Sequence, residues 1–392
     1  MAIHSLTESF PRWITTTQNA PEPVILYQCS LARNSEGFNF PGRSSIEERR
    51  SIEARILNTL AVVFPDVEQS YYSSADMDTN MIRFLSERRV VPYEFLIEPG
   101  LRGVFVDQKQ TLSVGVNVFD HLLFHAVSGD DTLQHLWESI DRLDSQLGKH
   151  LDYAYHERYG YLCSSLRLVG TGLNLSALLH LPAIVMTQEI PRIIELCRPR
   201  RLLFRGLSLG ETKSAAPAST TAGKIPRTDV EPVLQQSLYL DAFSSFHTNL
   251  DETVGNLFLL NSQDTLGVSE GEMLFQIEQV IAAIIREEEK AREKLLSNQR
   301  ERLLDHIGRA LGIARSARLL GMGEALALAS MIRLGTALGL ASGYNQNALN
   351  RAILECQQAH LQILHEIPAN PVALAAERAR MFRALFSGTD LN

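Results

Sequence analysis

The sequence predicts an α+β fold followed by a helical C-terminal domain, and three patterns support this prediction. Thr111–Asn117 alternates apolar residues with small or polar ones, which is the period of a β-strand. Thr132–Tyr155 repeats leucine and isoleucine at helical spacing, which indicates a long amphipathic helix. After residue 300 nearly every segment has helical periodicity. A mixed region of strands and helices is therefore expected to precede a domain made of helices.

Other elements follow from local signals along the chain. Residues 1–23 include three prolines and are expected to form an irregular leader. Ser45–Val63 places apolar residues at helical spacing behind serine and glutamate residues that favour a helix start. A helix is expected over Ala183–Cys197 and a strand over Arg201–Gly206. Later helices are expected over Ser269–Asp305, Leu303–Leu320, Gly323–Leu340, Asn347–Glu366 and Pro371–Leu385.

The composition argues against several classes of protein. A net charge of −8 disfavours a nucleic-acid-binding or anionic-membrane-binding surface, because such a surface needs a basic face. The four cysteines lack C-x-x-C spacing, so neither a zinc site nor a disulfide framework is expected. The chain shows no signal-peptide pattern and no run of about 18 apolar residues. We therefore expect a cytoplasmic protein without a membrane segment.

A set of short motifs gives the chain a family resemblance. The central stretch contains Gly160-Tyr161-Leu162, Val169-Gly170-Thr171-Gly172-Leu173 and His180-Leu181-Pro182. Further motifs lie in matching order at Leu31-Ala32-Arg33-Asn34, Asn117-Val118-Phe119-Asp120-His121, Phe204-Arg205-Gly206 and Thr265-Leu266-Gly267. The chain thus resembles the guanidino (phosphagen) kinases, most closely their bacterial branch, the protein-arginine kinases. Those proteins transfer phosphate from ATP to arginine side chains of other proteins.

The resemblance implies a domain organisation. It implies a guanidino-kinase fold, with a small N-terminal helical region and an antiparallel sheet flanked by helices, over residues 24–300. A helical C-terminal domain is expected over residues 301–392. Residues 212–249 look like an insertion relative to the family's length. Glu211–Pro232 is rich in Ser, Thr, Ala and Pro, so it is expected to be flexible.

The resemblance also implies where the chemistry of the family would lie. The arginines that hold the nucleotide phosphates in the family fall at Gln28, Ser30, Leu123 and Asn174, and none of these residues is charged. The glutamate pair that binds the guanidinium acceptor falls at Val118 and Phe119. Where the family reads Cys-Pro-Thr-Asn, this chain has Ser165-Leu166-Arg167-Leu168, so Ser165 is a further changed catalytic position.

Two family positions keep a charged residue. Arg205, in the Arg-Gly motif, is either a remaining phosphate ligand or an ordinary ion-paired arginine. Glu211 stands for the family's loop glutamate, displaced by one residue. Arg33 survives as well, but in the family motif it belongs to the scaffold.

Other candidate sites have weaker support. Asp120, His121 and His125 bring acid and imidazole groups together, but Asp120 and His121 belong to a scaffold motif and His125 to a strand, so no metal site is expected. In the bacterial branch the C-terminal domain carries a phosphoarginine pocket. The nearest residues here are Arg378 and Arg380, which are expected to be solvated, with a phosphoarginine reader as the alternative.

Three functions remain open. The first is a catalytically impaired homologue that acts as a binding or regulatory protein, with a zinc-finger-like activator or Clp protease components as partners and possible oligomers. The second is an active kinase that uses Mg-ATP and a rebuilt site with Arg205, Arg167 and acids from residues 211–252. The third is an interaction scaffold unrelated to proteolysis. No cofactor is expected under the first reading.

Overall fold

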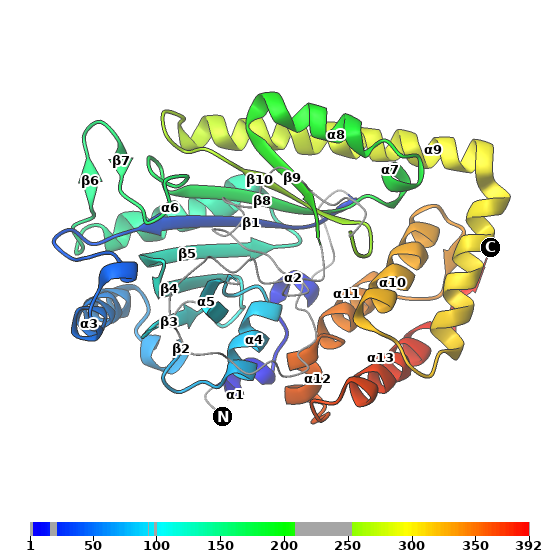
Figure 1. Cartoon of the computed structure of the whole chain (residues 1–392), viewed down its shortest axis with the longest axis horizontal. Helices are drawn as coiled ribbons and strands as arrows, with labels where there is room; N and C mark the ends of the chain where they lie inside the picture. Colours follow the sequence, from blue (N-terminus) through cyan, green and yellow to red (C-terminus); the bar gives the residue numbers. More distant parts are fainter. Residues whose placement is uncertain (1–2, 16–21, 93, 98–99, 208–252, 392) are drawn as a thin grey trace, which may run out of the picture.

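The protein is built around one antiparallel sheet. The computed structural model describes residues 3–15, 22–92, 94–97, 100–207 and 253–391. Within these ranges eight strands form the main sheet, and all neighbours are antiparallel (Figure 1). The strand order is β2 (Tyr71–Ser73), β3 (Gly103–Val106), β4 (Leu112–Val118), β5 (Asp120–Ser128), β1 (Val24–Arg33), β8 (Leu173–His180), β10 (Leu257–Ser262) and β9 (Leu202–Gly206).

Helices surround this sheet and continue beyond it. Two small ribbons pair β6 (Tyr155–His156) with β7 (Gly160–Tyr161) and β11 (Ala341–Ser342) with β12 (Asp390–Leu391). We call residues 160–173, which contain the first two motifs of the central stretch, the signature motif. The helices before it are α1 (His4–Thr7), α2 (Arg12–Thr15), α3 (Ile46–Val63), α4 (Thr79–Glu87), α5 (Glu94–Ile97) and α6 (Leu133–Leu147). Those after it are α7 (Pro182–Met186), α8 (Ile190–Cys197), α9 (Glu270–Ser316), α10 (Met322–Ala337), α11 (Gln346–Glu355), α12 (Gln358–Leu364) and α13 (Pro371–Phe386).

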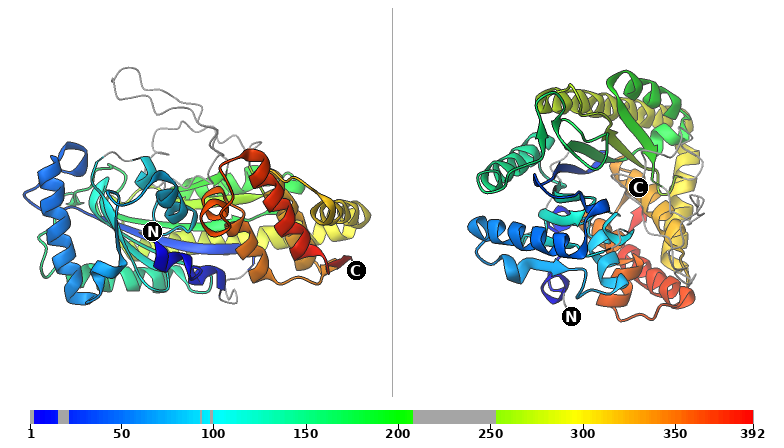
Figure 2. Two further views of the ribbon diagram at one scale, coloured as in Figure 1. Left: turned by 90° about the horizontal axis from the view of Figure 1, so that it is seen from below. Right: turned by 60° about the vertical axis from the view of Figure 1, so that its left-hand side comes forward.

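The antiparallel sheet and the helical C-terminal region confirm the predicted fold class. Figure 2 shows the C-terminal helices, orange to red, grouped beside the sheet. Helix α3 begins as predicted, because Ser45 and Glu48 form a reciprocal capping box. The strand predicted over residues 111–117 is β4. None of the helices in the described ranges is long and apolar enough to cross a bilayer.

Several predicted boundaries were wrong. The leader is not wholly irregular, because residues 4–7 and 12–15 form short helices. The helix predicted over residues 132–155 ends at Leu147. The helix predicted over 183–197 is two helices, since Pro191 cannot donate a backbone hydrogen bond and its ring would clash with the preceding turn. The two helices predicted over 269–305 and 303–320 are both present within α9, but the kink between them lies at Gln299 rather than near residue 304. Residues 347–366 are divided between α11 and α12.

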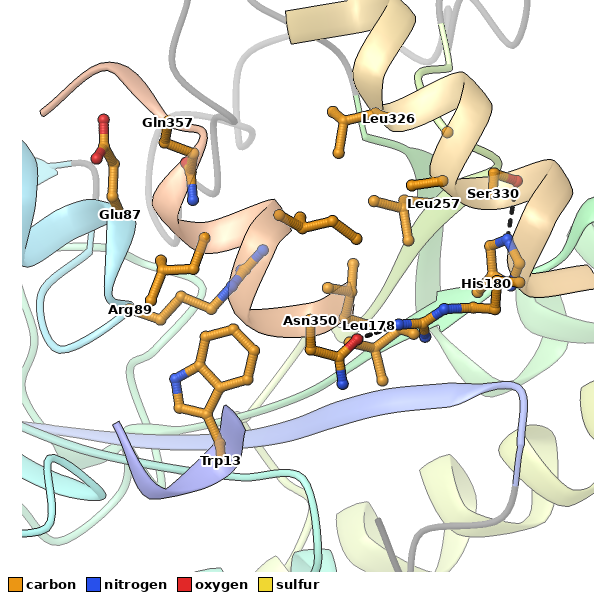
Figure 3. A pocket seen from close by; sticks show the side chains of 16 residues that line it. Trp13, Glu87, Arg89, Leu178, His180, Leu257, Leu326, Ser330, Asn350 and Gln357 are labelled. Carbon is orange, nitrogen blue, oxygen red and sulfur yellow. Dashed lines mark hydrogen bonds between the residues drawn. The ribbon is translucent and has the colours of Figure 1, made fainter. Parts of the chain in front are cut away.

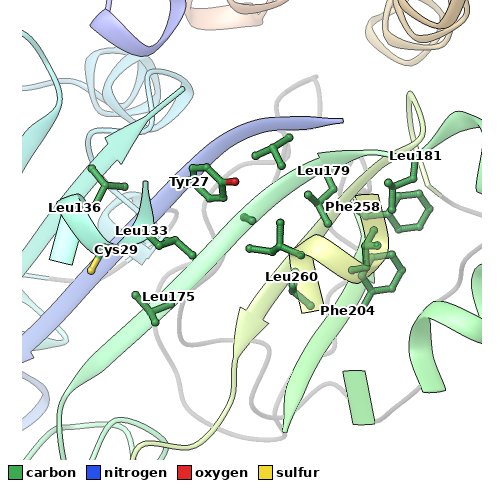
Figure 4. Packing of buried hydrophobic residues seen from close by; sticks show 14 of the residues in the cluster. Tyr27, Cys29, Leu133, Leu136, Leu175, Leu179, Leu181, Phe204, Phe258 and Leu260 are labelled. Carbon is green, nitrogen blue, oxygen red and sulfur yellow. The ribbon is translucent and has the colours of Figure 1, made fainter. Parts of the chain in front are cut away.

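The main core lies on one face of the sheet. Cys29 on β1, Leu175 on β8 and Leu260 on β10 point into it, and helices α6, α8 and α9 pack over them. Figure 4 shows this packing, in which Leu133 and Leu136 of α6 approach the sheet from one side. At the β9 edge the rings of Phe204 and Phe258 stack 5.0 Å apart. Alternate residues of the same strands therefore point to the opposite face.

A buried arginine joins the sheet to the signature motif. The Arg33 guanidinium, 2% exposed, donates to Asp144 of α6 from Nε (3.2 Å) and Nη2 (2.8 Å). Its Nη1 donates to the carbonyl of Thr171 (2.7 Å), and its Cζ lies 3.5 Å from the centre of the Tyr161 ring. Gly172 must be a glycine here, since a Cβ would lie 2.5 Å from the carbonyl oxygen of Ala32. Arg33 is thus a scaffold residue, as predicted.

We expect Arg33→Leu to lower the free energy of unfolding by about 3–5 kcal/mol, because Asp144 would remain buried without its cation. Arg33→Lys should recover only part of this loss, since an ammonium cannot reproduce the planar fork. Urea unfolding monitored by circular dichroism measures both effects. Arg302→Leu, on the exposed side of α9, is the matched control. A loss for Arg33→Leu no larger than for the control would contradict this role.

Candidate active-site face

One face of the sheet collects the positions that the family resemblance assigns to the nucleotide. Gln28 and Ser30 alternate with the core residue Cys29, so they point away from the main core. Ser30 lies opposite Asn174 on β8 and opposite His125 on β5. Ala32 lies opposite Leu123. The backbone therefore brings these positions together, although the sequence places them far apart.

The Ser30 position holds a neutral hydrogen-bonded pair. His125 Nε2 lies 3.0 Å from the carbonyl of Arg89, so this nitrogen carries the proton. Its Nδ1 then accepts from the Ser30 hydroxyl at 2.8 Å. Burial lowers the pKa of His125 to about 4, so the ring is neutral at pH 7. Both ring nitrogens are already engaged, which leaves none for a metal ion.

The Gln28 and Asn174 positions are also neutral and buried. The Ser176 hydroxyl donates to Gln28 Oε1 at 3.4 Å. The Ser262 hydroxyl lies 3.5 Å from Asn174 Oδ1 and accepts from the backbone N–H of Leu175 at 3.0 Å. Asn174 Nδ2 has no hydrogen-bond partner in the described part of the chain. These side chains offer a phosphate only neutral donors.

The remaining changed positions are apolar or lie away from the sheet face. Leu123 packs with Ala32, Cys163 and Leu168, and Phe119 and Val169 lie against this group, which we call the Leu123 cluster. Val118 is fully buried in a different cluster with Val104 and Val106 of β3. Ser165 is half-buried, and its carbonyl accepts from the N–H of Leu168 at 3.0 Å. The side chains of the Leu123 cluster thus fill the space between β5 and the signature motif.

Asp120 and His121 hold the hairpin that carries these positions. Asp120 accepts from Asn34 Nδ2 and from the backbone N–H of Ser164, each at 2.6 Å. His121 Nδ1 accepts from the N–H of Ser35 at 3.0 Å, and its Nε2 donates to the carbonyl of Asn39 at 3.0 Å. Burial lowers the pKa of His121 to about 4. In the described ranges no group of three or more potential ligands could hold a metal ion.

The charged candidate residues differ in where the structure places them. Arg205 is half-buried on β9 opposite Leu259, on the same sheet face. Arg167 is half-buried in the signature segment. Glu211 and the insertion predicted over 212–249 lie outside the described residues. The structure thus places one of the two charged family positions, Arg205, on the face.

The C-terminal arginines require a correction. Arg378 was expected to be solvated, but it is fully buried, and its Nε donates to the carbonyl of Cys356 at 2.7 Å. The expectation was wrong because α13 packs that side against α11, as the burial of Leu374 and Phe382 shows. Arg380 is exposed and forms an ion pair with Glu377, with an Nε–O distance of 2.8 Å.

Comparisons with known proteins agree with this architecture. Residues 51–220 match the C-terminal catalytic domain of ATP:guanido phosphotransferases, and residues 300–391 match the C-terminal domain of protein-arginine kinase McsB. A protein-arginine kinase of Clostridium acetobutylicum is 30% identical over 357 residues, which cover 90% of this chain and 93% of the relative. The chain belongs to the protein-arginine kinase family.

Other members and more distant folds extend the comparison. The protein-arginine kinase of Symbiobacterium thermophilum is 28% identical, with 96% of each chain covered. Among solved structures, a duplicated taurocyamine kinase from Schistosoma mansoni superposes with a TM-score of 0.53 over 78% of this chain and 41% of its own, at 17% identity. Lombricine kinase gives 0.50 over 72% of this chain and 71% of its own, at 19% identity. These two likenesses show the guanidino-kinase fold alone.

Sequence reasoning missed two features of this family member. The pairing of Ser30 with His125 depends on the register of β1 and β5, which no motif encodes. A cavity between the sheet and the C-terminal helices, lined by Arg89 and Arg333, was not expected either (Figure 3). The double arginine at 88–89, directly after a helix, was the signal available in the sequence.

The buried neutral histidines predict an acid-sensitive fold. The pKa of His125 is about 4 in the folded chain and near 6.5 in the unfolded chain, so the unfolded chain binds the proton first as the pH falls. Stability is full above about pH 6.5 and declines down to about pH 4, and His125 alone should cost about 2 kcal/mol between pH 7 and pH 5. His125→Gln should remove this part of the decline in urea unfolding. His306→Gln, at an exposed position, should leave the pH dependence unchanged; an equal effect of both variants would refute the assignment.

The two positions to which the resemblance assigns acids, Val118 and Phe119, should respond differently to a carboxylate. Val118→Glu places a charge in an apolar cluster and should lower the free energy of unfolding by about 3 kcal/mol or more. Phe119→Glu, one residue away and half-buried, is the matched control and should cost about 1 kcal/mol. Thermal unfolding of the two variants measures the difference. Small and equal losses would mean that water still reaches both positions.

Proposed function

We propose that this member of the protein-arginine kinase family does not transfer phosphate by the family mechanism and acts as a binding or regulatory protein. One observation carries the proposal. The sheet face where the resemblance places phosphate ligands carries neutral, buried, hydrogen-bonded side chains at Gln28, Ser30 and Asn174, and an apolar one at Leu123. Mg-ATP would be the cofactor only if the active-kinase alternative held.

The energetics of phosphoryl transfer support this proposal. Catalysis of this reaction depends mainly on positioning the phosphates and neutralising their charge. Charged clamps in such sites contribute orders of magnitude in rate. Replacing cations at four positions removes charge that one remaining Arg205 cannot supply. The glutamate positions, Val118 and Phe119, offer no carboxylate to hold a guanidinium or to accept its proton.

The packing supports it as well. The Leu123 cluster fills with aliphatic and aromatic carbon a region where a triphosphate and a guanidinium would need water-like surroundings. A polyanion placed against these side chains would lose hydration without gaining ligands. The same packing stabilises the hairpin between β4 and β5, so the change has a structural benefit. A chain under no demand for catalysis can keep such a replacement.

The regulatory role and its setting extend the proposal further. The family's link to Clp proteolysis and to a zinc-finger-like activator suggests that this chain binds components of the same system in the cytoplasm. The test is to add the purified chain, in stoichiometric amount, to an active protein-arginine kinase of the same cell. A concentration-dependent change in the rate of arginine phosphorylation supports regulation. An unchanged rate, with no complex in size-exclusion chromatography, would favour a scaffold unrelated to proteolysis.

Nucleotide binding gives the sharpest test. A ligand at one hundred times its dissociation constant stabilises a fold by about 2.7 kcal/mol, which a melting curve resolves. We expect millimolar Mg-ATP to leave the melting temperature of this chain unchanged. The protein-arginine kinase of Clostridium acetobutylicum, measured in parallel, is the positive control. A clear ATP-dependent rise, together with phosphoarginine formation on a protein substrate, would establish the active-kinase alternative instead.

A further inference from the structure

A small cavity lies where the sheet meets the C-terminal helices. It encloses about 60 Å³ and is lined by residues of β8, β10, α10 and α11, by Trp13 of α2, and by Arg89 just after α4 (Figure 3). Most of the lining is apolar, contributed by Trp13, Leu178, Leu257, Leu326 and Leu354 among others. It is separate from the Leu123 cluster. Apolar walls with a few polar groups are typical of ligand sites, and the volume of this cavity limits its ligand to a few non-hydrogen atoms.

Arg89 enters this cavity as an unpaired cation. Within the described ranges no hydrogen-bond acceptor or carboxylate pairs with its guanidinium. Burial lowers the pKa of Arg89 to about 10, and no neighbouring charge offsets this effect. Figure 3 shows the side chain running past Trp13 toward the middle of the cavity. A desolvated guanidinium without a partner is costly, so an anion that reached it would bind favourably.

The backbone at Arg89 is also unusual. Arg89 has φ +61°, and the N–H groups of Arg89 and Val90 donate to the carbonyls of Ser86 (2.9 Å) and Leu85 (3.2 Å). This is the Schellman ending of a helix, whose left-handed position is normally a glycine. An arginine is less favourable than a glycine at this position, because its Cβ crowds the backbone in the left-handed conformation. The fold therefore gains nothing locally from having an arginine at this position.

The other polar groups of the cavity are mostly engaged. The Glu87 carboxylate accepts from the N–H groups of Ala359 (2.9 Å) and His360 (3.1 Å) at the start of α12 and contacts the His360 ring (2.7 Å), and within the described ranges it forms no ion pair with Arg89. Arg333 donates to Asn350 Oδ1. Asn350 Nδ2 is left buried without a partner in the described part of the chain. The cavity thus offers a cation, an unused amide donor and apolar walls.

We propose that this cavity binds a small apolar carboxylic acid. The carboxylate would receive hydrogen bonds from the Arg89 guanidinium, and the apolar part would contact Trp13 and the leucine side chains. The bound acid would contact both the sheet and helices α10 and α11, and would thereby stabilise their contact. This binding needs neither ATP nor phosphoryl transfer, so it is independent of the function proposed above.

Calorimetric titration of the full chain with propionate and butyrate, which are small enough for a cavity of this volume, tests the proposal. Both acids should bind, whereas propylamine, propanol and inorganic phosphate should not. Arg89→Gly removes the guanidinium and suits the left-handed backbone, so it should fold at least as stably and bind the acids at least about tenfold more weakly. Arg89→Asn, which also tolerates this backbone, is the second variant. Arg302→Ala, exposed on α9, should leave binding unchanged.

Each possible result of these titrations either supports or overturns the proposed binding site. Acid binding that both Arg89 variants weaken and the control preserves supports the site. No binding of either acid at roughly 10 mM overturns it. Binding that survives both Arg89 substitutions also overturns it, because the acid then lies elsewhere. If inorganic phosphate binds as well as the acids and loses binding in both variants, the proposed ligand class is wrong.

Discussion

The ion pair between Arg33 and Asp144, in which two guanidinium N–H groups donate to Asp144 Oδ2, is the interaction on which the sheet's arrangement depends. Arg33 ends the central strand β1, Asp144 lies on the helix that covers the main core, and the same guanidinium holds the carbonyl of Thr171 just before β8. Two neighbouring strands and one helix therefore share a single buried cation. The ring of Tyr161 packs against the guanidinium group of Arg33. A planar group with five donors is suited to this role, and a lysine is not.

The contacts that hold the fold together are separate from the positions that the resemblance assigns to nucleotide and guanidinium binding. The contacts of Arg33, Asp120 and His121 lie among backbone carbonyls, buried amides and one helix, and none of them requires a nucleotide. The residues on the opposite sheet face can therefore change without disturbing the strand order. Ser30 and His125 are an example. This neutral pair joins two strands, whereas a charged residue at the same place would carry a desolvation cost. The contacts that hold the fold together thus do not depend on the side chains of that face.

Much of the fold could be predicted from the sequence, since the motifs around Arg33 and Gly172 and the helical periodicity after residue 300 are local signals. The breaks between helices were harder to predict. Pro191 is evident in the sequence, but apolar residues continue at helical spacing on both sides of it, so one helix was predicted where the structure has two. The burial of Arg378 was missed because it depends on α11, a helix more than 20 residues earlier in the chain. The positions to which the resemblance assigns the family's ligands could be named in advance. Their partners could not, since Ser176 and Ser262 approach Gln28 and Asn174 only through the strand register.

The length of α9 has a mechanical consequence. Its 47 residues, at about 1.5 Å each, follow a helical path of roughly 70 Å, and this path turns at Gln299. The first half packs on β8 and α7, and the second half packs on α10 and α13. The two halves meet at Gln299, where the helical angles are interrupted, so a movement of the C-terminal helices relative to the sheet would bend the chain at this residue. The sheet and the C-terminal helices would therefore move relative to each other about the kink in α9, and not as independent units on a flexible linker.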